Sequence, residues 1–330
     1  MLYLQISTKI YLFISFYFIM ILKGGITMKY VEYSFRHAKA IIESDPFFKK
    51  HYDELIQVIS NISDEQLQNN FELKKQQHAD KGTAFKSLTP SINELLKENL
   101  YNIPGWEKEV EIFNDENNQL GNTEWRLDFA YKNAFAVEVA FNHGEAITWN
   151  LIKPVLASEL NHVKKAVQTQ IGIYICATNE LKEFGNIDSA SGSYEKVLRY
   201  LPPLRNQLTI PMMIIGLRAP RSFFISKDTK SIKSCNNQIS AKQLLNLVER
   251  NLSSQNIPFE KSYTVKKVIN NNIEKQKFKL FCEPKQLCVY DTIQSKSILN
   301  AYLKTHKLID ISNHSISYED AIKIFDYLTQ

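Results

Sequence analysis

The chain has 330 residues and a formal net charge of +5, with 44% apolar and 23% charged side chains. This is the composition of a soluble globular protein with room for one large domain or two ordinary ones, and its mild positive charge is compatible with a polyanionic partner. The sequence contains no P-loop, GxSxG, HExxH or GxGxxG motif. Nucleotide-binding, serine-hydrolase, zinc-protease and dinucleotide-binding functions therefore have no support, and no organic cofactor is expected.

The cysteines indicate the cellular compartment. They stand at positions 176, 235, 282 and 288 and form neither a CxxC pair nor a disulfide framework. No second pair of Cys or His residues has the spacing of a zinc site. We therefore expect reduced thiols and a cytoplasmic location.

The first 27 residues contain an apolar run from Ile10 to Leu22 that is flanked by lysines. The run is shorter than the ~20 residues that a membrane-spanning helix needs, and no small-residue cleavage site follows it. The Lys-Gly-Gly sequence before Met28 can be encoded by a bacterial ribosome-binding sequence. We expect residues 1–27 to be a mis-translated upstream extension, with Met28 as the true start and no membrane segment in the mature protein. The alternative is a hydrophobic N-terminal segment that anchors the protein to a membrane.

The segment from Met28 to about Asp80 has apolar residues at three- and four-residue spacing, which predicts helices. Ser63 and Gln66 match a capping box that opens another short helix. We interpret this segment as helical packing support for the domain that follows.

A further helix is expected from Ile92 to about Leu100, followed by a strand at 110–113. It carries Asn93 and Glu94 directly ahead of the hairpin described next. The ordinary role of Glu94 alone would be a solvated ion pair with a neighbouring lysine.

A two-stranded hairpin is predicted between Trp125 and Trp149. The first strand carries Asp128, the turn lies at residues 132–133, and the second strand carries Glu138. Carboxylates are rare within apolar strands unless a partner offsets their desolvation, so two of them in paired strands suggest a shared cation. The alternative is an edge hairpin whose acids face water.

The remaining pattern gives the fold class. A helix is expected from about Ile152 through Ala166 with Pro154 near its first turn, then a buried strand at 171–177, a helix around 194–200 and a buried strand that ends at Leu217. This order predicts an α/β/α sandwich with a mixed central sheet. We expect it to span residues 28–218 and to be followed by a basic α+β subdomain at 219–330. The basic residues of that subdomain form either a solvated face or a surface that contacts a nucleic-acid backbone.

The spacing Asp128-x9-Glu138-x-Ala140 resembles the D-xn-(D/E)-x-K signature of PD-(D/E)XK nucleases. Together with the segments EVAFNHGEAITWNL, LASELNHV and PLRNQL, it makes the region from about Ser91 to Leu217 similar to the BglII-type restriction endonucleases, which are related to the BamHI group. The resemblance implies a type II restriction endonuclease that hydrolyses double-stranded DNA with Mg²⁺ at a specific sequence. It also implies a homodimer that reads a palindromic site.

The resemblance assigns roles by position. Asp128 and Glu138 would be the Mg²⁺ ligands, with the carbonyl of Val139 as a third, and either Asn93 or Glu94 would support the site. Alternation along the strand puts Glu138, Ala140 and Asn142 on one face. The candidates for contact with bases are Asn142, His143, Arg205 and Asn206.

The chain departs from the signature at Ala140, where relatives carry Lys, Gln or Glu. An alanine can neither orient nor deprotonate the attacking water. Three explanations stay open: Asn142 or Glu145 has taken over this role, a metal-bound hydroxide suffices, or the protein has lost cleavage and binds specific DNA only.

Overall fold

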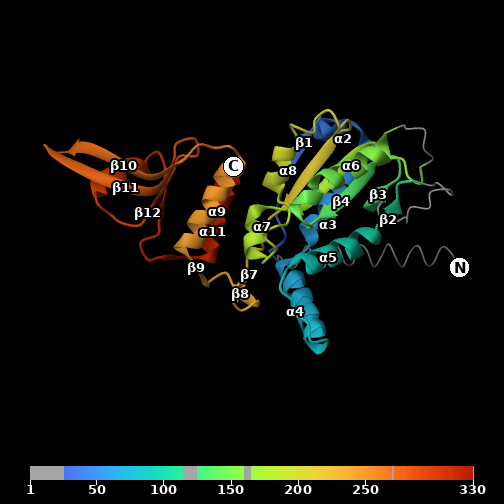
Figure 1. The fold of residues 1–330 in the computed structure, drawn as a ribbon, viewed down its shortest axis with the longest axis horizontal. Coiled ribbons are helices and arrows are strands. Elements are labelled where there is room, and N and C mark those ends of the chain that lie inside the picture. The colour runs from blue at the N-terminus through green and yellow to red at the C-terminus, as the bar shows by residue number, and fades with distance from the viewer. Residues whose placement is uncertain (1–25, 114–124, 160–164, 270, 330) are drawn as a thin grey trace.

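The structure is a computed structural model that describes residues 26–113, 125–159, 165–269 and 271–329 (Figure 1). The apolar run Ile10–Leu22 lies outside these residues, so its interpretation stays a prediction. None of the helices in the described part of the chain is long and apolar enough to cross a membrane.

A six-stranded mixed sheet forms the centre of the larger part of the molecule. Its strand order is β1-β6-β5-β4-β3-β2. Strands β4, β5 and β6 run parallel, whereas β1, β3 and β2 pair antiparallel to their neighbours. The strands are β1 (Tyr30–Phe35), β2 (Trp106–Glu111), β3 (Arg126–Tyr131), β4 (Phe135–Ala140), β5 (Ile171–Ala177) and β6 (Met212–Leu217).

Helices cover both faces of this sheet, which is why β5 and β6 are buried along their whole length. One face packs against α3 and α5 through residues such as Val137 and Ile173, and the other packs against α6 and α8 through Tyr174 and Ile214. The α/β/α sandwich expected from the sequence is thereby confirmed. The helices are α2 (Ala38–Ser44), α3 (Pro46–Asn61), α4 (Asp64–Asp80), α5 (Thr89–Tyr101), the 3₁₀ helix η1 (Gly144–Ala146), α6 (Ile147–Ser158), α7 (Asn179–Phe184) and α8 (Tyr194–Tyr200).

The chain after β6 forms a second group of elements around its own apolar cluster. A four-stranded sheet has the order β10-β11-β12-β13, and two small sheets pair β7 with β8 and β9 with β14. The elements are β7 (Phe223–Ile225), β8 (Ile232–Ser234), β9 (Gln238–Ser240), α9 (Ala241–Ser254), β10 (Glu260–Ile269), β11 (Asn272–Cys282), β12 (Leu287–Tyr290), α10 (Lys296–Leu303), β13 (Lys307–Asp310), β14 (Ser315–Ser317) and α11 (Tyr318–Thr329).

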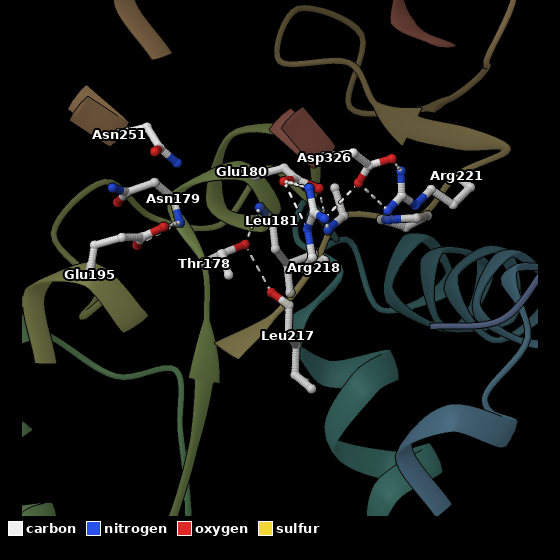
Figure 2. Close-up of polar contacts among 12 residues, drawn as sticks. Thr178, Asn179, Glu180, Leu181, Glu195, Leu217, Arg218, Arg221, Asn251 and Asp326 are labelled. Carbon is white, nitrogen blue, oxygen red and sulfur yellow. Dashed lines mark hydrogen bonds and ion pairs between the residues drawn. The ribbon is translucent and has the colours of Figure 1, made fainter. Parts of the chain in front are cut away.

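A buried ion-pair network joins the two parts (Figure 2). Arg218, directly after β6, contacts Glu180 of α7 at 2.7 Å and Asp326 of α11 at 2.6 Å, and Arg221 also binds Asp326. The Phe184 ring of α7 packs edge-on against Tyr318 within the core of the second part. The chain therefore passes from one part to the other through buried residues.

Three predicted elements differ from the structure. Tyr30–Phe35 is a strand antiparallel to β6, not part of a helix, because its alternating residues complete the edge of the sheet. Helix α6 starts at Ile147 and ends at Ser158, so Pro154 lies inside the helix instead of in its first turn. The capping box is present, with Ser63 and Gln66 each bonding the backbone of the other, but it opens a helix of 17 residues.

Candidate active site

The two strands that carry the predicted acids separate at the acids. Strands β3 and β4 are paired from Tyr131↔Phe135 to Phe129↔Val137, and their pairing ends there. The next position along this register would place Asp128 opposite Glu138. The Val139 N–H donates a hydrogen bond of 2.7 Å to the Asp128 side chain instead of to a backbone carbonyl of β3. The local opening of the ladder thus leaves both carboxylates side by side at one end of the hairpin.

Glu138 is a buried carboxylate in an unusual electrostatic setting. Its side chain is 2% exposed, and its Oε1 atom has no hydrogen-bond partner. Burial and the nearby Asp128 raise the pKa of Glu138 to about 8, although Lys153 opposes this shift. A buried oxygen without a partner, next to a second carboxylate, is what a cation site presents when no cation neutralises it.

Asp128 is held by a hydrogen bond from the backbone of β4. Burial raises the pKa of the Asp128 carboxyl, while the hydrogen bond from Val139 and the charge of Lys153 act in the opposite direction. The Val139 N–H is thus used to orient Asp128. The role of the Val139 carbonyl as a metal ligand stays a prediction.

Lys153 of α6 also reaches Glu138, although no role was predicted for it from the sequence. Its Nζ lies 2.5 Å from Oε2 of Glu138 and donates a hydrogen bond of 3.0 Å to the carbonyl of Arg126. One turn earlier on the helix, the Trp149 ring packs edge-on against Trp125, with ring centroids 5.0 Å apart. This contact fixes α6 over the start of β3 and directs Lys153 towards the acids.

A signal for Lys153 does exist in the sequence. It is the one charged residue among the twelve of α6, whose remaining side chains are apolar or neutral. A lone charge within an apolar helix must find a partner, because burying an unpaired ammonium is costly. That the partner is Glu138 depends on how α6 crosses the sheet, which the sequence pattern does not reveal.

The two candidate residues of helix α5 have different surroundings. Glu94 forms an ion pair with Lys74 of α4. Asn93 has an Oδ1 atom that is buried without a hydrogen-bond partner. It stands one helical turn before Lys97, whose charge lowers the pKa of Asp128. Whether Asn93 or Glu94 supports the acids stays a prediction.

The part of the chain that contains the two acids matches a known protein family. The family model described as restriction endonuclease BglII/BglIII matches residues 30–217, which include all six strands of the central sheet. The chain belongs to the BglII/BglIII restriction endonuclease family. A solved structure, restriction endonuclease BglII complexed with a DNA 16-mer, is similar with 18% identity and a TM-score of 0.41, over 63% of this chain and 88% of that one. No curated protein matches.

The segment after β4 forms the rim of the site in this BglII/BglIII family member. Asn142 and His143 are exposed. The Asn142 side chain accepts a bond of 3.1 Å from Asn150, and His143 makes a β-bridge with Ser191. Among the described residues, neither Asn142 nor Glu145 is hydrogen-bonded or ion-paired to Asp128 or Glu138.

Arg205 and Asn206 lie elsewhere. They are exposed in the turn after α8, and the Arg205 carbonyl accepts a hydrogen bond of 2.7 Å from Arg36, directly after β1. Strand β1 is at the opposite edge of the sheet from β2 and β3. The structure therefore does not bring these two residues together with the acids, and their contact with DNA stays a prediction.

The residues of the site suit a hard divalent cation. Within the described part of the chain, no group of three or more His, Cys, Asp or Glu side chains could hold a metal ion. Mg²⁺ does not need such a group, because it commonly takes one or two carboxylates and fills its other positions with water and phosphate. Asp128 and the unpartnered oxygen of Glu138 supply this minimal set.

Proposed function

We propose that the protein is a type II restriction endonuclease that hydrolyses phosphodiester bonds of double-stranded DNA at a specific sequence with Mg²⁺. The observation that carries the proposal is the convergence of Asp128, Glu138 and Lys153 where β3 and β4 separate. Membership of the BglII/BglIII family supports it. The opposite charges of the three side chains match the needs of phosphodiester cleavage, which are a metal ligand set and a cation near the phosphate.

Asp128 and Glu138 would hold Mg²⁺ through their carboxylate oxygens. The ion, when bound, supplies charge neutralisation at the phosphate and lowers the pKa of a bound water. The hydrogen bond from the Val139 N–H keeps Asp128 in one orientation. Asn93, with its unpartnered carbonyl oxygen, would support the site from α5.

Lys153 would take the role that Ala140 cannot perform. Ala140 is 3% exposed and packs in the apolar cluster that includes Ile147 and Leu151, so α6 fills the space that a longer side chain would need. The same helix brings the Lys153 ammonium beside Glu138. From there it can orient the attacking water and neutralise charge that develops on the phosphate.

DNA recognition is proposed for the exposed rim, where Asn142 and His143 can reach base edges. A homodimer would cut both strands of a palindromic site, one per subunit. The test is incubation of the purified protein with mixed-sequence plasmid and Mg²⁺, followed by sequencing of the ends. Fragments with one defined end sequence that vanish in Asp128→Asn support the proposal. Specific binding without any cut would instead favour the DNA-binding alternative.

A further inference from the structure

The hairpin β10–β11 extends beyond the sheet to which it belongs (Figure 1). Strand β12 pairs with β11 at residues 280–282, so residues 272–279 of β11 have β10 as their one pairing partner. We call the paired segments 263–269 and 272–278 the ribbon. It lies at the opposite end of the molecule from β2 and β3 in Figure 1.

The two faces of the ribbon differ. Val265, Gln276 and Phe278 point to the covered face and are buried beneath α10 and the segment before it. The Gln276 side chain accepts hydrogen bonds from the backbone N–H groups of Gln294 and Ser295. The covered face therefore holds the ribbon in a fixed orientation.

The open face is basic. Lys266 stands directly opposite Lys275, and the neighbouring pair on this face is Thr264 with Lys277. All four side chains are exposed. Within the described part of the chain, none of the three lysines has an ion pair. Like charges directly across a strand pair destabilise it, so this arrangement costs stability unless an anion binds there.

The tip of the open face is apolar. Val268 pairs with Ile273, and these side chains are 73% and 74% exposed, the highest values among the large apolar residues of the described chain. Lysines on an edge strand can serve to prevent aggregation. An exposed apolar tip acts against that explanation, because large apolar side chains on an otherwise unpaired hairpin favour association.

A basic groove connects the rim of the candidate active site with the foot of the ribbon. It has a volume of about 570 Å³ and is lined by five cationic side chains and one carboxylate, Glu249, which pairs with Lys261. The cationic residues are Lys182, Lys196, Arg199, Arg250 and Lys261. Its wall includes Ser191, which bridges to His143. Lys261 is the second residue of β10, directly before the ribbon. Positive side chains thus continue from the rim to the ribbon.

We propose that the open face of the ribbon binds duplex DNA that flanks the cleaved site, an inference that rests on the proposed function. Lys266, Lys275 and Lys277 contact phosphates, and Val268 and Ile273 rest against the apolar sugar and base edges of a groove. A two-stranded ribbon fits the major groove of B-DNA, which is about 12 Å wide. The phosphate contacts carry no sequence information, so they add affinity to any duplex.

The test measures binding of the full-length protein to a labelled duplex of random sequence by fluorescence anisotropy, without divalent metal, from about 50 to about 200 mM salt. The ribbon variant combines Lys266→Gln, Lys275→Gln and Lys277→Gln. Each lost phosphate contact lowers the slope of log K against log salt by about 0.9, so a decrease of about 2.7 is expected. A control variant with Lys242→Gln, Lys304→Gln and Lys307→Gln makes the same charge change at exposed positions outside the open face of the ribbon.

Two further measurements separate the proposal from a structural effect. The variant Val268→Thr with Ile273→Thr should weaken binding severalfold with an unchanged salt slope, because it removes apolar contact without removing charge. Thermal unfolding of the lysine variant should occur at the wild-type temperature or above it, because the repulsion between Lys266 and Lys275 is gone. If the lysine variant loses DNA binding but keeps or gains stability, the three lysines serve to bind DNA and not to stabilise the fold.

Equal slopes for the ribbon variant and the control would overturn the proposal. So would loss of binding to phosphatidylserine vesicles with unchanged DNA binding, which would assign the ribbon to a membrane surface. If wild-type protein binds no duplex, the proposed function itself fails. If it binds and the ribbon variant binds equally well, only the ribbon is excluded.

Discussion

The ammonium of Lys153 lies 2.5 Å from Oε2 of Glu138, although the two residues stand on a helix and a strand that the chain connects through a turn of 3₁₀ helix. This pair brings a cation to the two acids in a chain that has Ala140 at the position where the signature expects Lys, Gln or Glu. It also makes the proposed chemistry testable one side chain at a time.

Replacement of Lys153 by Met should reduce the cleavage rate by about 10²-fold or more while leaving duplex binding within about threefold of wild type. The reason is that Met keeps the aliphatic volume but removes the charge near the phosphate. Single-turnover cleavage rates and anisotropy titrations provide the two readouts.

The matched control for Lys153 is Lys74→Met, which breaks another Lys–Glu pair between two elements of the same domain. It should leave cleavage unchanged. Partial recovery in Lys153→Arg, together with a shifted pH profile, would point to a role in the reaction. Equal losses in Lys153→Met and Lys74→Met would contradict it.

Glu138 should make the metal-free protein less stable as the pH rises. The pKa of Glu138 is raised from 4.5 to about 8 in the folded protein, so the folded state binds this proton more tightly than the unfolded chain. The free energy of unfolding therefore falls between about pH 4.5 and about pH 8, by an amount on the order of a few kcal/mol. Denaturation of wild type and Glu138→Gln across this range should show a smaller decline for the variant, and parallel curves would refute the assignment.

Mg²⁺ binding should compete with the proton on Glu138. A ligand that binds only the folded state raises its unfolding temperature, and a carboxylate must be deprotonated before it coordinates a metal. Mg²⁺ should therefore raise the unfolding temperature more at about pH 8.5 than at about pH 6.5, and little in Asp128→Asn. This scan needs no DNA. A similar increase at both pH values, or in the variant, would place the ion elsewhere.

Glu180→Ala should destabilise the protein by about 3–5 kcal/mol, because it removes a partner from the Arg218 guanidinium, whose side chain is 6% exposed. Glu319→Ala is the control. It breaks a pair with Lys323 in which both side chains are more than half exposed, so it should cost less than about 1 kcal/mol. Urea denaturation measures both. A small effect of Glu180→Ala would mean that the buried network contributes little to stability.

The sequence predicted the sheet where the pattern is strong. Strands β5 and β6 are continuous apolar runs, and the hairpin around Asp128 and Glu138 alternates clearly, so their type was evident. Strand β1 was missed because Tyr33 and its neighbours fit helical spacing as well as alternation. In the structure, pairing with β6 decides between the two, and this is a tertiary effect.

The site was predictable only in part for a similar reason. The two acids belong to adjacent strands, so their proximity follows from the hairpin alone. The contribution of Lys153 depends on the angle at which α6 crosses β4, and the choice between Asn93 and Glu94 depends on where α4 places Lys74. The spacing of apolar and polar residues along the chain does not reveal such long-range geometry.

The buried passage through Arg218 limits how far the protein can be shortened. A truncated protein ending after β6 would strip the Phe184 ring of its neighbours Tyr318 and Phe325 and leave Glu180 without its guanidinium partner. The truncated protein would expose an apolar ring and an unpaired carboxylate on α7, and we expect it to aggregate. A fusion of this protein to another targeting module should therefore contain the elements after β6 as well as the central sheet.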